Sequence, residues 1–209
     1  MGPSPTDPEL LTAWQGGASS AGETLFERYY PVAERFFHNK VLDPCEREDL
    51  IQTTFLECVE SAARFRGTSS FRTFLLGIAT HIWLSRCRRA FGPRNHAALG
   101  SMSVEDMGQT PSDVIADDES KRMMLAALRS VPLQTQVLLE LRYWEGLKLR
   151  ELAEVLEIPD STVKNRLLRA KQVLEQQMER LARSGQALDS TMTTLEGWAA
   201  RVRKLDDAS

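Results

Sequence analysis

The sequence has few cysteines, and they do not show the spacing of a disulfide framework or of a metal site. The 209 residues include three cysteines, Cys45, Cys58 and Cys87, and no two of them form a CxxC pair. An odd number without paired spacing argues against a disulfide framework. Together with His38 and His81 they also lack the spacing of metal ligands. We therefore expect no metal and no other cofactor.

The sequence also lacks the features of a membrane protein, a secreted protein or a common enzyme class. Its apolar runs are only a few residues long, and its first ten residues (MGPSPTDPEL) show no basic-then-apolar signal pattern. A Gly-rich phosphate loop and a GxSxG sequence are both absent. We expect a cytoplasmic protein with no membrane insertion and no enzymatic activity.

Positive charge is not in excess, but it is concentrated in one part of the chain. The formal net charge is -3 at pH 7, whereas binding to nucleic acid requires local positive charge for phosphate contacts. Residues 64–94 contain seven arginines and no carboxylate. Residues 101–120 contain six carboxylates and no lysine or arginine. This alternation of basic and acidic blocks is more informative than the total charge.

Apolar residues recur at helical spacing almost everywhere, and the strict alternation of a β-strand is absent. The sequence therefore predicts an all-α fold. A stretch rich in Gly, Pro, Ser, Asn and Asp separates two helical parts, which is typical of a linker. We expect two small helical domains, residues 1–92 and 119–183, joined by an acidic linker, residues 93–118, and followed by a C-terminal extension, residues 184–209.

One predicted helix in the first domain has a clear start and a clear buried face. Asp43 and Pro44 are typical of an N-cap followed by a proline at the first helical position. The apolar stripe that follows predicts which side chains are buried. Its members are Ile51, Phe55, Cys58, Val59 and Ala62.

The most specific motif is a helix-turn-helix over residues 148–171, KLRELAEVLEIPDSTVKNRLLRAK. Two short apolar faces would pack the helices together and leave the polar face of the second helix exposed. Hydroxyl, amide and guanidinium groups on that face match base edges and phosphates of the DNA major groove. The predicted DNA-binding residues are Ser161, Thr162, Lys164, Asn165, Arg166 and Arg169. An αα-hairpin with solvated basic residues is the alternative.

With the N-terminal half included, the chain resembles the extracytoplasmic-function group of the sigma-70 family, which keeps only regions 2 and 4. The resemblance covers about Leu10 to Glu179. In region 2 it rests on LFERYYPVAERFF, REDLIQTTFLECV, ARFRG and FRTFLLGIA, and in region 4 on VPLQTQVLLELRYWEGLKLRELAEVL and IPDSTVKNRLLRAK. It implies a sigma factor that binds core RNA polymerase, recognises the -35 and -10 promoter elements and helps open the DNA.

The resemblance also implies roles for particular residues. The polymerase-binding segment corresponds to Glu48, Asp49, Leu50 and Gln52, for which a solvated helix face is the alternative. Contacts to the -10 element correspond to Phe65, Arg66, Phe71, Arg72, His81, Trp83, Arg86, Arg88 and Arg89. Arginines would hold phosphates and aromatic faces would stack on an unpaired base. Aromatics at helical spacing are more often core, and core packing is the alternative for Phe71 and Trp83.

Two alternative functions remain open from the sequence. A stand-alone helix-turn-helix regulator would explain residues 148–171 but not the first domain, and a sigma-like decoy would bind an anti-sigma factor without acting at a promoter. We expect an anti-sigma factor among the partners in either sigma-like case. The acidic linker would run through the polymerase cleft or form a disordered tether. The extension carries an apolar stripe around Trp198 that needs a partner.

Overall fold

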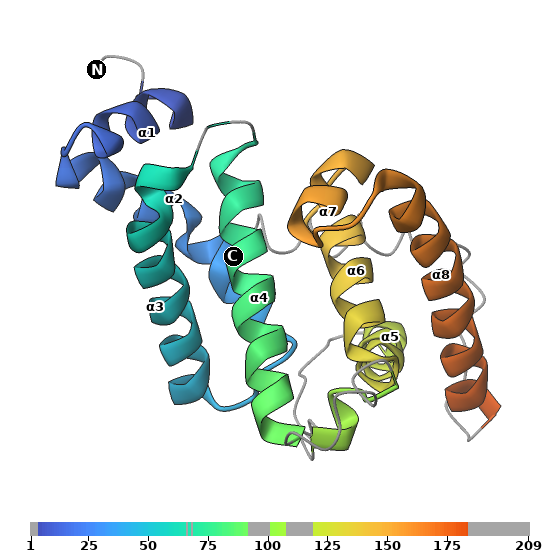
Figure 1. Cartoon of the computed structure of the whole chain (residues 1–209). Coiled ribbons are helices and arrows are strands. Elements are labelled where there is room, and N and C mark those ends of the chain that lie inside the picture. The colour runs from blue at the N-terminus through green and yellow to red at the C-terminus, as the bar shows by residue number, and fades with distance from the viewer. Residues whose placement is uncertain (1–3, 66, 68, 92–100, 108–118, 184–209) are drawn as a thin grey trace. The chain divides into compact units, whose positions relative to one another are not determined.

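The computed structural model describes residues 4–65, 67, 69–91, 101–107 and 119–183 (Figure 1). These residues form helices and the loops between them, and they contain no strand, so the predicted all-α fold is confirmed. The chain divides into two compact units, the first ending near Arg86 and the second beginning near Cys87. The predictions made for Arg66 and for residues 184–209 lie outside the described residues.

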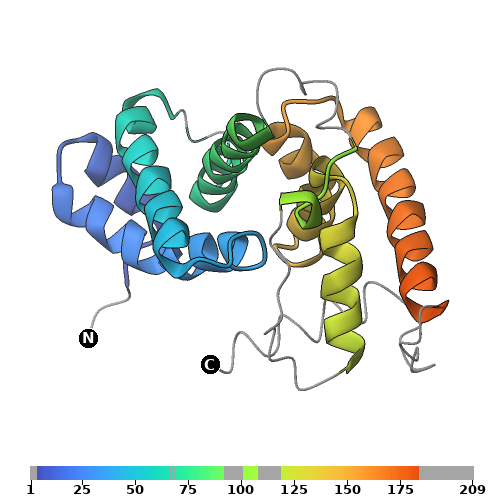
Figure 2. The same cartoon turned by 90° about the horizontal axis from the view of Figure 1, so that it is seen from below.

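The first unit comprises α1 (Asp7–Gln15), α2 (Ser19–His38), α3 (Pro44–Ser61), the 3₁₀ helix η1 (Ala62–Arg64) and most of α4 (Phe71–Phe91), whose last residues fall within the second unit. Helix α1 packs on α2, and α2 packs on α3. The second unit comprises the 3₁₀ helix η4 (Glu105–Met107), α5 (Glu119–Ser130), α6 (Leu133–Tyr143), α7 (Leu149–Val155) and α8 (Asp160–Arg183). Helices α5 and α6 both pack against α8 (Figure 2).

Short polar side chains mark the starts of helices in the first unit. The Asp43 carboxylate accepts a hydrogen bond from the backbone N–H of Cys45 (3.0 Å), with Pro44 at the first helical position, as predicted. At the start of α4 the hydroxyl of Ser70 accepts a hydrogen bond from the backbone N–H of Thr73 (3.1 Å). Each contact satisfies one of the backbone donors that a helix N-terminus leaves without a partner.

Aromatic side chains form much of the core of the first unit. Phe71 at the start of α4 is fully buried beside Leu25 of α2. Its ring packs edge-on against Tyr29, with 5.2 Å between ring centroids, and Trp14 of α1 packs edge-on against Phe26 at 5.3 Å. Such pairs contribute about 0.5–1.5 kcal/mol each beyond the area they bury. The cluster therefore ties α1, α2 and α4 together.

Polar contacts reinforce the attachment of α1. The carboxylate of Asp7 forms an ion pair with Arg28 and accepts a hydrogen bond from the hydroxyl of Tyr29. Burial, the hydrogen bond to Asp7 and the charge of that carboxylate raise the pKa of Tyr29 to about 12. The phenol therefore stays protonated as a donor at neutral pH.

The predicted buried face of α3 is correct at most positions and wrong at Val59. Ile51, Cys58 and Ala62 are buried, whereas Val59 is 49% exposed. Because one residue advances a helix by about 100°, Val59 turns away from the core when its neighbour Cys58 faces it. Thr54 occupies the buried face instead, with its hydroxyl donating to the carbonyl of Leu50 (2.7 Å). A local hydrogen bond thus satisfies a polar group that the apolar pattern did not predict to be buried.

Part of the predicted linker belongs to the folded second unit. Val104 is 1% exposed, η4 packs on α5, and the backbone N–H of Leu133 donates to the carbonyl of Met102 (2.8 Å). The Asp106 carboxylate accepts hydrogen bonds from the backbone N–H and the hydroxyl of Ser103 (2.7 and 2.9 Å). A tether without structure is therefore wrong for residues 101–107, because one apolar side chain and several backbone contacts fix them.

The second unit contains a cluster of buried polar side chains. Arg129, Gln136 and Glu140 are 5%, 1% and 4% exposed. The side-chain amide of Gln136 donates to the Glu140 carboxylate (3.0 Å). Burial lowers the pKa of Arg129, and the charge of Glu140 acts in the opposite direction. The Glu140 carboxylate therefore compensates a guanidinium that has lost most of its hydration.

Candidate nucleic-acid and protein interfaces

The predicted helix-turn-helix is present as α7, a short turn and α8. The backbone N–H of Ile158 donates to the carbonyl of Ala153 (3.0 Å), which closes the turn directly after α7. Leu152 of α7 and Val163 and Leu167 of α8 are buried. The predicted apolar faces therefore hold the motif within the second unit, and the polar face of α8 is left outward.

The turn carries a non-glycine residue in the left-handed region. Glu157 has φ of 52°, at the position where such turns usually place Gly or Asn. A side chain with a Cβ costs about 1–2 kcal/mol in this conformation. The turn therefore stores backbone strain that Gly or Asn at this position would largely avoid.

Glu157→Gly is expected to raise the free energy of unfolding by about 0.5–1 kcal/mol. The gain is the relief of left-handed strain, reduced by the larger entropy that glycine loses on folding. Urea titration of the full chain measures it. The matched control, Glu154→Gly, lies exposed within α7, where glycine should destabilise by about 1 kcal/mol. Equal destabilisation by both changes would contradict the account of strain at Glu157.

The outward face of α8 is a continuous stripe of exposed residues. It lies opposite the buried side chains of Val163, Leu167, Ala170 and Leu174. Its members are spaced three, one, three, one and three residues apart, which keeps them on one face of a helix. They are Ser161, Lys164, Asn165, Leu168, Arg169 and Gln172. Four of the six predicted DNA-binding residues are on this stripe, and the prediction did not include Leu168 and Gln172.

The other two predicted residues lie at the side of the stripe. Thr162 is half-buried, and Arg166 is exposed. At about 100° per residue, Arg166 lies about 130° around the helix from the middle of the stripe. A side chain in that position points towards the walls of a groove when the stripe faces its floor. The geometry therefore favours phosphate contact over base contact for Arg166.

The aromatic residues predicted to stack on a base are mostly buried. Phe71 and Trp83 are both 0% exposed, so the prediction that they present ring faces is wrong, and the alternative of core packing fits them. Phe65 is half-buried, with its ring 4.5 Å from that of Phe74 between centroids. Phe65 is the one residue of the three that keeps part of its surface accessible.

The predicted basic residues of α4 do not form one surface. Arg86 forms an ion pair with Glu46 of α3, so its charge joins two helices of the first unit. Arg72 is half-buried near the other end of the helix. His81 and Arg89 are exposed and Arg88 is half-buried, and their spacing of seven and eight residues places them on one side of α4. This side, His81 with Arg88 and Arg89, is the α4 basic face.

Helix α3 presents a second exposed stripe, which includes part of the predicted polymerase-binding segment. Asp49 and Gln52 are exposed, whereas Glu48 and Leu50 are half-buried. The stripe continues along the helix at spacings of one, three, three and one through Thr53, Leu56, Val59 and Glu60. Leu56 is 59% exposed. The sequence prediction missed Leu56, although its position seven residues after Asp49 is two turns along the same face.

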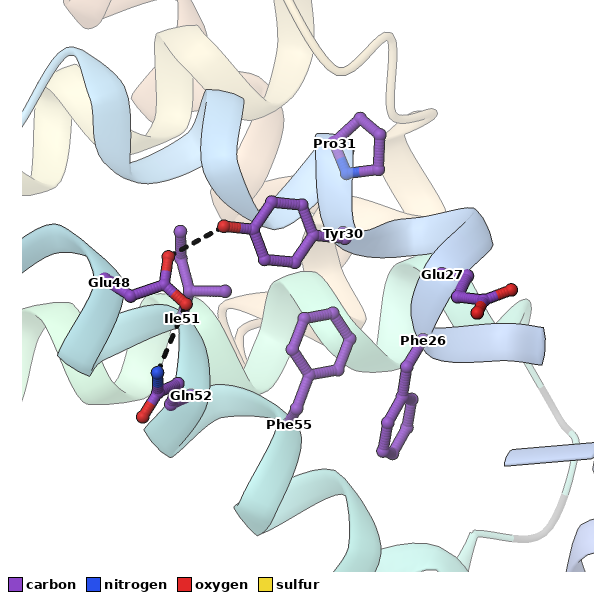
Figure 3. Close-up of a pocket in the computed structure, with 8 residues that line it drawn as sticks. All are labelled: Phe26, Glu27, Tyr30, Pro31, Glu48, Ile51, Gln52 and Phe55. Atoms are coloured by element: carbon purple, nitrogen blue, oxygen red, sulfur yellow. Dashed lines mark hydrogen bonds between the residues drawn. The ribbon is translucent and has the colours of Figure 1, made fainter. Parts of the chain in front are cut away.

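A groove between α2 and α3 adjoins this stripe (Figure 3). It has a volume of about 610 Å³, and Phe26, Tyr30 and Phe55 are among the residues that line it. The Tyr30 and Phe55 rings are nearly parallel, with 6.4 Å between centroids. The rim carries the carboxylates of Glu27 and Glu48. The groove is therefore aromatic within and acidic at its edge.

Glu48 is held at the edge of this groove by two neighbours. Its carboxylate accepts hydrogen bonds from the hydroxyl of Tyr30 (2.7 Å) and from the side-chain amide of Gln52 (3.2 Å), as Figure 3 shows. The hydrogen bond to Glu48 raises the pKa of Tyr30, with further contributions from burial and from the Glu48 charge. Glu48 thus fixes the position of Gln52 on the exposed stripe.

Among the described helices, none combines the length and the apolar character needed to cross a membrane. Within the same residues, no group of three or more His, Cys, Asp or Glu side chains is arranged to hold a metal ion. Burial raises the pKa of Cys58 to about 12, with a smaller contribution from the charge of Glu57. The thiol is therefore protonated at neutral pH and unsuited to act as a nucleophile.

Comparisons with known proteins match both units. Family models described as "Sigma-70 region 2" and "Sigma-70, region 4" match residues 25–90 and 121–174. The chain is 29% identical over 164 residues to the ECF RNA polymerase sigma factor SigX of Bacillus subtilis, covering 76% of this chain and 84% of the relative. It is 27% identical over 186 residues to the ECF RNA polymerase sigma-E factor of Haemophilus influenzae, covering 84% and 97%.

Two solved structures share the fold. One is CnrH in complex with the cytosolic domain of CnrY, with a TM-score of 0.60, 17% identity, and coverage of 83% of this chain and 97% of the other. The second is the sigma factor RpoE in complex with the anti-sigma factor NepR from Bartonella quintana, with a TM-score of 0.54, 16% identity, and coverage of 75% and 96%. At these identities the likeness concerns the fold alone.

Proposed function

The chain belongs to the sigma-70 family, in its extracytoplasmic-function group, and from that premise we propose how its two units divide the work of a sigma factor. The first unit binds core RNA polymerase and acts at the -10 element, and the second recognises the -35 element. The chain acts as an initiation factor and not as an enzyme. The proposed domains are residues 1–92 and 119–183, the second of which is joined by residues 101–107 of the linker, with the extension 184–209 outside both.

The observation that carries this proposal is the exposed stripe of α3 in the unit that matches region 2. Asp49 and Gln52 supply a charge and an amide, and Leu56 and Val59 supply apolar area at the centre of the same face. Protein interfaces typically combine an apolar centre with a polar surround. A regulator that acts through its helix-turn-helix alone would have no use for this surface.

The polymerase contact therefore extends beyond the predicted segment. Asp49, Leu50 and Gln52 remain in it, and Leu56 and Val59 are added because they share the exposed face of α3. Glu48 acts through its hydrogen bonds to Tyr30 and Gln52. An acidic and apolar surface fits a polymerase helix that carries basic and apolar side chains.

The promoter contacts follow the exposed basic and polar surfaces. The α8 stripe enters the major groove of the -35 element, where hydroxyl, amide and guanidinium groups meet base edges. The α4 basic face holds phosphates near the -10 element, and Phe65 offers part of a ring to an unpaired base. Arg66 and Arg72 are retained as phosphate contacts, because the basic block of the sequence surrounds them.

An anti-sigma factor is a further proposed partner. The two solved structures that share the fold are described as complexes, one with the cytosolic domain of CnrY and one with the anti-sigma factor NepR. The surface that binds polymerase is exposed on α3, where a competing protein would block docking. Reduced polymerase binding in the presence of such a partner would support this proposal.

One experiment separates a sigma factor from a stand-alone regulator. The full chain is mixed with core RNA polymerase, and separately with duplex DNA that carries candidate promoters, and both mixtures are analysed by size-exclusion chromatography. A sigma factor co-elutes with core polymerase. Failure to join polymerase, together with tight binding to duplex DNA by the chain alone, would favour the regulator and contradict the proposal.

Arg166→Ala is expected to weaken promoter binding by the holoenzyme almost equally on cognate and scrambled -35 elements. The flank position of Arg166 assigns it to phosphate, which carries no sequence information. The slope of log affinity against log salt concentration should fall by about 1. Fluorescence anisotropy at several salt concentrations measures both quantities. A loss confined to the cognate element would show base readout and overturn the phosphate assignment.

A further inference from the structure

One exposed apolar side chain stands in the middle of the polar face of α8. Leu168 is 61% exposed, the highest value among the large hydrophobic residues that the structure describes. Its neighbours one turn away on the same face are Lys164, Asn165 and Gln172, all polar and all exposed. The apolar side chain of Leu168 is therefore exposed to water, and no apolar neighbour on its own face of the helix covers it.

The surroundings of Leu168 argue against a docking site for another protein. Protein-binding patches are contiguous apolar areas, whereas the residues three and four positions from Leu168 on this face are charged or carry amides. The two exposed apolar residues of α3, by contrast, are three positions apart and adjoin each other on one face. Leu168 therefore suits a small apolar group that is itself surrounded by polar groups.

The major groove of DNA offers one such group. The floor of the groove presents hydrogen-bond donors and acceptors from every base pair, and its apolar feature is the C5 methyl of thymine. Lys164, Asn165 and Gln172 can bond to the donors and acceptors on either side of that methyl. An apolar side chain at the centre of the stripe then contacts the methyl without leaving a polar group unsatisfied.

We propose that Leu168 reads a thymine in the -35 element by packing against its C5 methyl group. This inference rests on the proposed function, because it requires α8 to lie in the major groove of the promoter. It adds a base preference that the polar residues of the stripe do not supply. Burial of one methyl group corresponds to a change in affinity of about fourfold.

The test removes the methyl group and the leucine separately and together. A promoter is first selected from a library randomised over the -35 element with the wild-type chain and core polymerase. Each thymine of the selected element is then replaced by deoxyuridine, which keeps every hydrogen-bonding group and lacks the methyl. Wild-type holoenzyme should lose about fourfold in affinity at one position, and Leu168→Ala should be insensitive to the same replacement.

Three controls sharpen the result. Leu168→Met keeps an apolar side chain and should retain the sensitivity to deoxyuridine. Leu42→Ala makes the same change at another exposed leucine, in the loop between α2 and α3, and should behave as wild type. Deoxyuridine in the -10 element should affect wild type and Leu168→Ala equally. Because alanine favours helices and Leu168 is exposed, the Leu168→Ala chain is expected to fold.

The outcomes separate this inference from the function on which it rests. A selected promoter with no thymine whose methyl matters, or equal sensitivity in wild type and Leu168→Ala, overturns the role of Leu168 and leaves the sigma function standing. Recovery of no promoter at all from the library contradicts the proposed function and the inference with it. Loss of sensitivity in Leu168→Ala alone supports the inference.

Discussion

Replacement of Asp49 by lysine is expected to weaken binding to core RNA polymerase by about 30-fold or more. Asp49 is exposed at one end of the α3 stripe, where a carboxylate would face a basic partner helix. Truncation of one member of a charge pair across an interface costs about 2–5 kcal/mol, and placing like charges together adds repulsion. At about 1.4 kcal/mol for each factor of ten, this corresponds to the stated loss.

The Asp49 experiment needs a control for the change in charge. Glu23→Lys makes the same reversal on the exposed surface of α2 and should leave polymerase affinity within about twofold of wild type, since surface charges outside an interface contribute little. Circular dichroism should give the same helix content for both variants. Retained polymerase affinity in a folded Asp49→Lys chain would remove α3 from the interface.

The largest expected effect on stability is that of Glu140→Leu in the second unit. Glu140 and Arg129 are both buried, and the charge of Glu140 opposes the effect of burial on the pKa of Arg129, so loss of the carboxylate removes a favourable charge from a site that already disfavours the guanidinium. The Gln136 amide loses its acceptor as well. Breaking a buried charge pair costs about 3–5 kcal/mol. Urea titration of the full chain should show this loss.

The double change Arg129→Leu with Glu140→Leu tests the explanation. Replacement of a buried ion pair by apolar side chains is often neutral or stabilising, so the double variant should recover most of the stability that the single change removes. Additive destabilisation by the two changes would show that Glu140 acts through packing and not through the charge of Arg129.

The sequence predicted best those features that depend on neighbours in the chain. The start of α3 at Asp43 and Pro44 follows from hydrogen bonding within a few residues, and the apolar faces of α7 and α8 follow from the helical period. Local geometry alone determines each of these features.

Features that depend on distant residues were not predictable in the same way. Arg86 and Glu46 are forty positions apart, and only the packing of α3 beside α4 brings them together. The basic block therefore predicted that Arg86 contacts phosphate, whereas in the structure its guanidinium pairs with the Glu46 carboxylate. Phe71 is buried because the aromatic rings of α1 and α2 surround it, which the spacing of aromatics within α4 does not reveal.

Exposed apolar residues were the most informative departures from the sequence prediction. A helical pattern assigns apolar side chains to the core by default. Val59 was therefore predicted to be buried, and Leu168 was not among the predicted DNA-binding residues. Their exposure, 49% and 61%, directs attention to the face of α3 that we propose for polymerase and to the face of α8 that we propose for DNA. Only the packed structure shows which apolar residues are left over after the core is filled.

Run-off transcription with purified core polymerase, over a library of promoters, tests the central claim most directly. If one chain both docks on polymerase and reads promoter DNA, the full chain should direct transcripts from a subset of templates that core polymerase alone does not use. Sequences of those templates should share two elements, one for each helical unit. Addition of the folded chain without any new transcript start would contradict the account.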